Sequence, residues 1–409
     1  MEKWVVYITQ QTIQELFNNY LTKQPIFSNK KTLTSSYTPE TVPHRDKQIN
    51  QLGRILLPAL KSERPSNVFI YGSTGTGKTL TTKYVLDELV KTATQNNNII
   101  KTIYVNCKMK KVADTEYRFL AYLAEKLGET VPSTGLPTDQ VYKIFFKSLD
   151  KLEGVVILIV DEIDALVNKV GDDFLYNLTR INQDLANVDL SVIGISNNLS
   201  FTDYLDARVK SSLSEEELIF PPYNAVQLQE ILQKRAEIAF TNGKINDGVT
   251  QKCAALAAQE HGDARRALDL LRVAGEVAER EGDEEVSIKH VDKAEEKVDT
   301  DRIIEVVKTQ PKQSKAIIYA LLTKLTKENE KTLTGDVFNN YITICKKAVL
   351  KPLTQRRVSD ILSELDMLGI INAKVISNGR YGRTREISLA FSEDIHKKIM
   401  DFFKNEFYF

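Results

Sequence analysis

The fold of this chain is decided by one stretch, Gly72-Ser73-Thr74-Gly75-Thr76-Gly77-Lys78-Thr79-Leu80. Its first eight residues fit G-x-x-x-x-G-K-T, the loop that surrounds nucleotide phosphates. An apolar run of β-forming residues, 68–71, precedes the loop, and a helical pattern, 80–90, follows it. The glycines let backbone N–H groups turn toward an anion, and the helix N-terminus adds positive charge. We expect Lys78 to contact the phosphates of ATP and the Thr79 hydroxyl to bind Mg²⁺, with Leu80 completing the site.

The composition is that of a globular chain without net charge. Its 409 residues include 55 Lys and Arg against 55 Asp and Glu, and the length allows two or three domains. No apolar run approaches the ~20 residues of a membrane helix, and the start lacks an apolar signal region. The cysteines (Cys107, Cys253 and Cys345) and the four histidines lack metal-ligand spacing. We therefore expect buried free thiols, a cytoplasmic location and no membrane partner.

Periodicity divides the chain into four parts. Residues 1–36 have a weak helical period and a polar, basic stretch, and we interpret them as a surface extension. Residues 37–222 alternate strands with helices, which predicts an α/β domain with a parallel sheet. Residues 223–300 show only helical periods and predict a lid, and residues 301–409 hold a linker and a third domain. The expected sheet strands are 68–71, 99–105, 155–160, 190–195 and 218–220.

Acidic and amide side chains follow two of these strands. Asp161 and Glu162 end the continuous apolar strand 155–160. Asp161 can hold Mg²⁺ and Glu162 can polarise the attacking water as a general base, whereas the plain alternative is a charged cap on a buried strand. Asn197 follows the next strand, and strand ends face the ligand crevice of an open α/β sheet. Its amide can orient the water or contact the γ-phosphate, and the alternative is a turn-forming Asn.

Two arginines are candidates for sensing the γ-phosphate. Arg208, in Leu205-Asp206-Ala207-Arg208-Val209, can reach a nucleotide on a neighbouring subunit as an arginine finger. Arg265, in the helical lid, can move over the γ-phosphate and so distinguish ATP from ADP. For both residues the alternative is a structural role, a surface ion pair for Arg208 and an ordinary helix position for Arg265.

The C-terminal part concentrates positive charge. Between residues 346 and 385 there are nine Lys and Arg against three acids. Three amphipathic helical patterns, the third capped by Thr354, precede two strands and predict a winged helix, a variant of the helix-turn-helix. The third helix suits the major groove of DNA, and the basic hairpin tip suits the minor groove. The candidate DNA contacts are Thr354, Gln355, Arg356, Arg357 and Ser359 on the helix and Arg380, Tyr381, Gly382 and Arg383 at the tip. A winged helix used only for protein contacts is the alternative.

The combined motifs resemble those of the AAA+ ATPases, in particular the archaeal Orc1/Cdc6 replication initiators. The resemblance covers residues 37–395. It rests on the phosphate loop, D-E-I-D from 161, the strand-end Asn197, L-D-x-R-V from 205, G-D-x-R-x-A-L-D from 262, Pro43-His44-Arg45, and the stretches 212–217, 220–223, 353–359 and 379–384.

The resemblance implies a role for several residues. By it, Asn197 is sensor 1, Arg208 the box VII arginine and Arg265 sensor 2. The residues implied at the adenine are Val42, Pro43, His44 and Arg45, and we also expect nucleotide contacts from Tyr223 and Arg235. The family's second DNA contact, an insertion in the ATPase domain, would correspond to Thr134, Gly135 and Leu136, where the alternative is a plain helix–helix loop. Ala207 departs from the Pro that the family usually has there, which leaves the aim of Arg208 open.

These observations predict a nucleoid-associated, ATP-dependent initiator that binds double-stranded origin DNA. ATP binding and slow hydrolysis would switch its state, and its partners would be other initiator subunits and the replicative MCM helicase. Two other functions use the same motifs: a clamp-loader-like remodelling ATPase that acts on protein, and an ATP-dependent transcriptional regulator with a winged helix.

Overall fold

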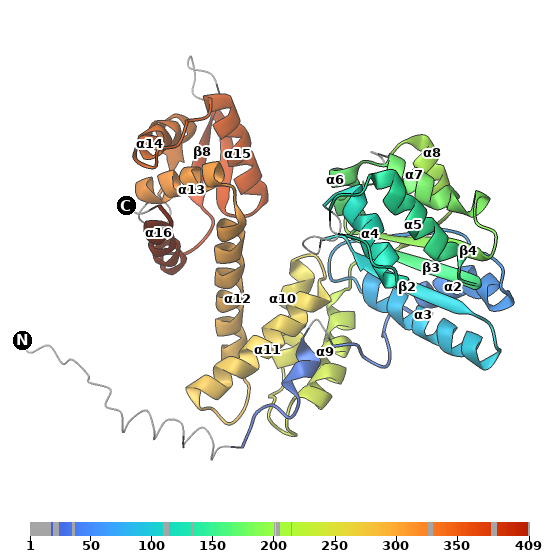
Figure 1. Cartoon of the computed structure of the whole chain (residues 1–409). Coiled ribbons are helices and arrows are strands. Elements are labelled where there is room, and N and C mark those ends of the chain that lie inside the picture. The colour runs from blue at the N-terminus through green and yellow to red at the C-terminus, as the bar shows by residue number, and fades with distance from the viewer. Residues whose placement is uncertain are drawn as a thin grey trace, which may run out of the picture. The chain divides into compact units, whose positions relative to one another are not determined.

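The computed structural model describes residues 18, 24–34, 37–108, 114–132, 134–199, 201, 205–213, 215–325, 330–377 and 383–407. The chain forms two compact units, residues 1–291 and 292–409, and each is described by itself. The first unit holds the phosphate loop in an α/β domain and a helical lid (Figure 1). The second unit holds a small three-stranded sheet among helices.

A five-stranded parallel sheet forms the centre of the first unit. Its strands lie in the order β2-β3-β4-β1-β5. Their bounds are β1 Val68–Tyr71, β2 Ile100–Asn106, β3 Gly154–Asp161, β4 Val188–Ser196 and β5 Glu216–Ile219. The prediction of a parallel α/β sheet is confirmed, since each of the four neighbouring pairs is parallel. The apolar run in β3 is buried throughout, as expected for a central strand covered on both faces.

Helices cover both faces of this sheet (Figure 1). One face packs on α2 Asp46–Leu56, η2 Leu57–Lys61 and α3 Lys78–Gln95. The other face packs on α4 Glu116–Lys126, α5 Thr138–Asp150, α6 Ile163–Val170, α7 Asp173–Arg180, η3 Ile181–Gln183 and α8 Ala207–Leu213. Alternate strand residues supply each core: Val156 and Leu158 lie in the larger one, and Ile157 and Ile159 in the other.

The strand register brings three predicted site segments to one edge of the sheet. Asp161 pairs with Ile195 at the ends of β3 and β4, directly before Glu162 and Asn197. Tyr71, the last residue before the phosphate loop, pairs with Ser196. The order of the strands therefore places the loop beside the two polar strand ends.

The lid is built from three helices, α9 Ala225–Ala239, α10 Val249–Gln259 and α11 Ala264–Glu281. Asn224 and Gln227 form a reciprocal capping box at the start of α9. The Asp263 carboxylate caps α11 by accepting from the N–H groups of Arg265 and Arg266. The first cap stands in the linker from β5 and the second in the turn between α10 and α11, and the two caps determine where α9 and α11 begin.

The N-terminal segment corrects one sequence expectation. We interpreted residues 1–36 as a surface extension, but residues 24–34 pack on the lid. Ile26 and Leu33 are 2% and 0% exposed, and Phe27 stacks on Phe240 with 4.7 Å between ring centroids. The short helix η1 Lys30–Leu33 lies against α9 and α11. The sequence did not predict the burial of these few apolar residues, because they stand in a polar, basic stretch without regular periodicity.

The second unit has the expected helix order and a sheet with one more strand than expected. Its elements are α12 Ile288–Thr309, which begins in the first unit, α13 Lys312–Lys324, β6 Thr332–Leu333, α14 Thr334–Lys347, α15 Gln355–Met367, β7 Ile371–Ser377, β8 Arg383–Leu389 and α16 Glu393–Phe407. The sheet is antiparallel in the order β6-β8-β7. Leu321, Tyr341, Leu362 and Phe403, from four helices, are all buried in its core. β6 and α16 were missed, because a two-residue strand and a terminal helix give weak sequence signals.

The cysteines behave as expected. Cys107, Cys253 and Cys345 are buried, and none of them is in a disulfide. Burial raises the pKa of the Cys107 thiol to about 12. Among the described residues, no helix has the length and apolarity to cross a membrane.

Val349 is held in a backbone conformation that disfavours it. The last turn of α14 closes with a bond from the Leu350 N–H to the Cys345 carbonyl, and Val349 lies between them at φ 55° with 93% of its surface exposed. This left-handed position after a helix usually holds glycine, because a Cβ there costs roughly 1–2 kcal/mol.

We expect Val349→Gly to stabilise the second unit by about 1 kcal/mol, the left-handed strain less the added entropy of glycine in the unfolded chain. Native-state hydrogen exchange of the α14 amides in the full chain measures this. Val375, 58% exposed on β7, is the matched control, because glycine in a strand should destabilise. Loss of protection in Val349→Gly would contradict the assigned strain.

Candidate nucleotide site

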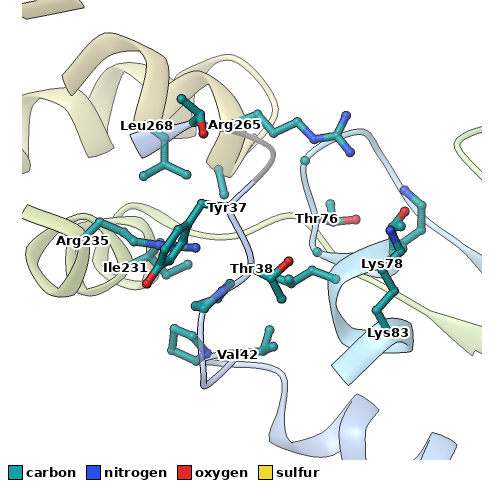
Figure 2. A pocket seen from close by; sticks show the side chains of 18 of the residues that line it. Tyr37, Thr38, Val42, Thr76, Lys78, Lys83, Ile231, Arg235, Arg265 and Leu268 are labelled. Carbon is teal, nitrogen blue, oxygen red and sulfur yellow. The ribbon is translucent and has the colours of Figure 1, made fainter. Parts of the chain in front are cut away.

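A cavity of about 860 Å³ lies between the sheet edge, the lid and the segment before α2. At one end it is lined by Gly75, Thr76, Gly77, Lys78, Thr79 and Leu80 of the phosphate loop, with Asp161, Glu162 and Asn197. The other end is lined by residues 37–43 and by α9. In Figure 2, Tyr37 and Arg235 face each other at this second end, while Lys78 and Lys83 lie at the first. The sequence-predicted nucleotide residues are thus largely brought together.

Lys78 is the central cation of the phosphate end. Its Nζ donates to the carbonyls of Gly72 and Ser73, both at 2.8 Å. It also donates to Asn197 Oδ1 at 2.7 Å, so the loop is joined to the end of β4. Lys78 is 5% exposed, and burial lowers the pKa of its ammonium to about 8. A triphosphate would place a negatively charged partner next to this buried ammonium.

Three oxygen groups meet at Asp161. The Thr79 hydroxyl donates to Asp161 Oδ2 at 2.9 Å, and the Tyr104 hydroxyl donates to the same oxygen at 2.7 Å. Hydroxyl and carboxylate oxygens are the ligands that Mg²⁺ prefers, so Thr79 and Asp161 fit the predicted metal site. Sequence reasoning missed Tyr104 and Lys83, whose Nζ lies 4.0 Å from the Tyr104 ring centroid. The only sequence signal was that Tyr104 stands two residues before the end of a strand in this sheet.

The predicted general base is held by two polar partners. Asn197 Nδ2 donates to Glu162 Oε1 at 2.7 Å, and Lys108 Nζ lies 2.9 Å from Glu162 Oε2. Glu162 itself is at φ 58°, a left-handed position that turns its side chain out of the strand direction. Asn197 therefore contacts both the loop lysine and the general base, as a residue that orients a water between them would.

The start of α11 lies directly on the phosphate loop. The Ala264 N–H donates to the Gly75 carbonyl at 3.2 Å. A Cβ on Gly75 would come within 1.7 Å of an Asp263 carboxylate oxygen, so only glycine fits here. Arg265, two residues after Asp263, lines the cavity and extends from α11 toward the loop (Figure 2). This is the position expected of a lid arginine that contacts a γ-phosphate.

The second end of the cavity, which we call the base end because it suits a nucleotide base, is formed by the N-terminal segment and the lid. The Arg235 guanidinium lies 4.5 Å from the Tyr37 ring centroid and donates to the Thr32 carbonyl at 3.4 Å. Tyr223 and Val42 also line the cavity, as does Pro43. An aromatic ring held by a cation and flanked by apolar side chains suits a planar base.

Some predicted nucleotide residues lie elsewhere. Gly72, Ser73 and Thr74 are not in the cavity lining, although the first two accept bonds from Lys78. His44 Nε2 lies 3.0 Å from Glu230 Oε2 on α9, and Arg45 is bonded to the back of the phosphate loop. The expectation that His44 and Arg45 border the adenine is therefore corrected. Residues next to one another in an irregular segment point in different directions, which a sequence motif does not show.

Arg208 lies on the surface at the start of α8. It pairs with Asp206, with Nε 3.0 Å from Oδ1, and its guanidinium lies 5.4 Å from the Tyr176 ring centroid. Its side chain is 66% exposed and does not line the cavity of its own chain. This placement leaves the arginine open to contact another subunit.

A histidine cluster in the lid has a structural explanation. Glu281, Asp283 and His290 bring their ligand atoms together. His290 Nδ1 accepts from the Ser287 N–H, so Nε2 carries the proton that faces Asp283 at 3.0 Å. A protonated Nε2 cannot bind a metal, and the cluster joins the end of α11 to the start of α12.

The predicted DNA residues of the second unit that the structure describes lie at the start of α15 and at the first residue of β8. The Thr354 hydroxyl accepts from the Arg357 N–H at 3.4 Å, the expected cap. Arg356 and Arg357 are exposed, but Arg357 NH1 lies 3.4 Å from Glu364 Oε1. Gln355 is exposed as well, whereas Ser359 is partly buried and its carbonyl accepts from Arg385. Arg380, Tyr381 and Gly382 lie outside the described residues, and only the backbone of Arg383, paired with Ser377, is described.

The predicted DNA-binding insertion lies between α4 and α5 of the first unit. Thr134 and Gly135 are exposed in a bend, and Gly135 has open space around its Cβ position. Leu136 is partly buried and packs on the core below the bend. Two of the three residues are thus available to a partner.

Comparison with known proteins agrees with these observations. Family models match in three regions: an AAA domain over residues 61–208, a Cdc6 AAA+ ATPase-type lid domain over 229–296, and a CDC6 C-terminal winged helix domain over 305–399. An ORC1-type DNA replication protein of Thermococcus onnurineus is 55% identical over 383 residues, covering 92% of this chain and 91% of that protein. ORC1-type DNA replication protein 1 of Methanosarcina mazei is 52% identical over 96% of this chain and 94% of its own length.

A solved structure extends the comparison to three dimensions. The Aeropyrum pernix ORC1 protein, solved in complex with DNA, is 44% identical to this chain with a TM-score of 0.83. The match covers 94% of this chain and 99% of that one.

The lowered pKa of Lys78 predicts a pH dependence of ATP binding. Phosphates favour the ammonium form, so binding above about pH 8 must take up a proton that the free site has lost. We expect ATP affinity to fall about tenfold per pH unit above that pH, measured by calorimetry. Lys78→Arg, whose side chain stays charged, should bind more weakly but without this slope. A flat profile in the parent would contradict the prediction.

We also expect Tyr104→Phe to weaken the metal site. Removing one hydrogen bond to the Asp161 carboxylate, worth about 1 kcal/mol, should raise the Mg²⁺ concentration needed for half-maximal ATP hydrolysis about fivefold. Tyr71→Phe is the matched control, because the Tyr71 hydroxyl donates to the Glu217 carboxylate at 3.0 Å in the same sheet and is outside the cavity lining. Equal Mg²⁺ requirements in both variants would exclude this role for Tyr104.

Proposed function

This chain belongs to the family of ORC1-type DNA replication proteins, and from this premise we propose that ATP in its AAA+ domain controls how it binds duplex DNA at replication origins. Its fold is that of the Orc1/Cdc6 initiators: an AAA+ sheet, a helical lid and a winged helix. The observation that carries the proposal is the contact of the lid with the phosphate loop, where α11 begins on Gly75 and Arg265 enters the nucleotide cavity.

The nucleotide is ATP or ADP in this proposal. Lys78 and the loop N–H groups hold the phosphates, and Thr79 and Asp161 hold Mg²⁺, which when bound neutralises developing phosphate charge. Arg265 contacts the γ-phosphate from the lid. Tyr37, Val42, Tyr223 and Arg235 surround the base.

Hydrolysis is weak and regulatory in this proposal. Glu162 acts as general base on a water oriented by Asn197. The ion pair with Lys108 holds the Glu162 carboxylate away from a water, so turnover waits until this contact opens. Slow turnover suits a protein whose ATP and ADP states have different tasks.

Duplex DNA is the proposed partner of the second unit. The N-terminal turn of α15, with Arg356 and Arg357, enters the major groove, and the wing tip with Arg380 and Arg383 enters the minor groove. The bend with Thr134 and Gly135 adds a contact from the AAA+ domain. The DNA complex of the Aeropyrum pernix ORC1 protein, which matches this chain over 94% of its length, supports this assignment.

The remaining partners follow from the same role. Arg208, exposed and outside its own cavity, is proposed to reach a nucleotide on a second initiator subunit. The DNA-bound form would recruit the replicative MCM helicase. We place the protein in the cytoplasm, on the nucleoid.

Anisotropy of labelled origin and composition-matched random duplexes, over a salt series with ATP or ADP, tests the proposal. With ~5 phosphate contacts, log K should fall with log salt at a slope near −4.5 for the parent, and origin duplex should bind more tightly. Arg356→Ala should reduce the slope by about 1. Lys397→Ala, which removes an exposed lysine of α16, is the matched control and should leave the slope unchanged.

Two results would contradict the proposal. Equal affinity for both duplexes at every salt concentration would exclude origin recognition. Identical DNA binding with ATP, with ADP and in a nucleotide-free Lys78→Ala variant would exclude nucleotide control.

A further inference from the structure

Arg45 is buried behind the phosphate loop, where three segments of the chain meet. It is 2% exposed, at the position before α2. Its Nε donates to the Thr76 carbonyl of the loop at 2.9 Å. Its Nη2 donates at 2.7 Å to the carbonyl of Pro221, in the linker from β5 to the lid helix α9. One guanidinium therefore joins the segment before α2, the phosphate loop and the linker to the lid.

The same guanidinium stacks on the linker. Its Cζ lies 3.8 Å from the ring centroid of Tyr223 and 5.6 Å from that of Phe220. Among the described residues no carboxylate pairs with Arg45, and burial lowers the pKa of its guanidinium. A buried cation held by carbonyls, aromatic rings and the Tyr223 hydroxyl, without a carboxylate, is costly to remove from water. Stability alone thus gives weak reason for an arginine here.

Tyr223 continues the path from Arg45 to the lid. A Cβ on Gly77 would lie 2.7 Å from the Tyr223 hydroxyl oxygen, so the ring is seated against the loop. On its other side, a Cβ on Gly262 would lie 2.3 Å from the Tyr223 carbonyl, and the Tyr223 N–H donates to the Gly262 carbonyl at 3.3 Å. Gly262 lies two residues before the start of α11 and three residues before Arg265. Close contacts without slack transmit small displacements, because packed groups shift together.

We propose that Arg45 is a positioning residue that couples the phosphate loop to the lid, so that Arg265 contacts the γ-phosphate when the loop holds a triphosphate. The inference rests on the proposed function, because it names how the nucleotide state reaches the lid. His44 adds a second tie from the same segment, with Nε2 3.0 Å from Glu230 Oε2 on α9. Arg45 does not line the nucleotide cavity itself. It contacts two residues that do, Thr76 and Tyr223.

The test compares ATP and ADP affinities by calorimetry on the full chain. Arg45→Met keeps the bulk and removes the fork of donors, and we expect it to lower the ratio of ATP to ADP affinity about fivefold or more, the range of ordinary coupling between sites. Arg265→Ala should lower the ratio similarly. The double variant should resemble either single one, because both remove the same contact to the γ-phosphate. Arg54→Ala, an exposed arginine of α2, is the matched control and should leave the ratio unchanged.

A second readout separates coupling from support of the loop. Adding ATP should protect the first-turn amides of α11, 264–268, from hydrogen exchange in the parent and not in Arg45→Met. Arg45→Lys, which retains the charge but not the planar fork of donors, should recover part of the ratio; it also serves as the test variant if Arg45→Met does not fold.

Three outcomes decide the matter. An unchanged ratio of ATP to ADP affinity in Arg45→Met, whether both affinities stay or both fall equally, would overturn the coupling role. Effects of Arg45→Met and Arg265→Ala that add would overturn it as well. If the parent itself bound neither nucleotide, the proposed function would fail, a result distinct from additive effects in a parent that binds both.

Discussion

The structure depends on a buried ammonium at the edge of a parallel sheet. Lys78 donates hydrogen bonds to two carbonyls of its own loop and to the amide oxygen of Asn197, and burial lowers the pKa of its ammonium. A cation withdrawn from water is costly unless negative charge is nearby, so the site is prepared for phosphate. Asp161 and Glu162 supply some of this charge, yet each is engaged with other partners. The triphosphate is thus the ligand that this electrostatic arrangement is built to receive.

The lid extends this arrangement beyond the sheet. Its helix α11 begins against Gly75, and its helix α9 supplies Arg235 to the base end of the cavity. The N-terminal segment closes the base end, since Tyr37 stacks on Arg235 while residues before it are buried between the lid helices. A nucleotide bound in this cavity would therefore contact the sheet, the lid and this segment at once. Because these three parts would share one ligand, their relative arrangement would depend on which nucleotide is bound.

The chemistry of the site is consistent with the proposed role as a switch more than a metabolic enzyme. Glu162, the predicted general base, is held in an ion pair with Lys108, and Arg208, proposed to act on a neighbouring nucleotide, does not line the cavity of its own chain. Under the proposal, both features would delay hydrolysis until another event changes them. The exposed arginines at the start of α15 would then carry the response to the nucleotide state.

The sequence by itself determined the phosphate loop, the parallel sheet, the lid and the winged helix, because each depends on local spacing and on apolar periodicity. It also identified Asp161, Glu162 and Asn197, since polar residues that follow buried strands must gather at one edge. The placement of Tyr104, Tyr37 and Arg45, in contrast, is visible only in the folded structure. These residues act through partners distant in sequence, and which way a side chain points in an irregular segment depends on the elements packed around it, which no local pattern records.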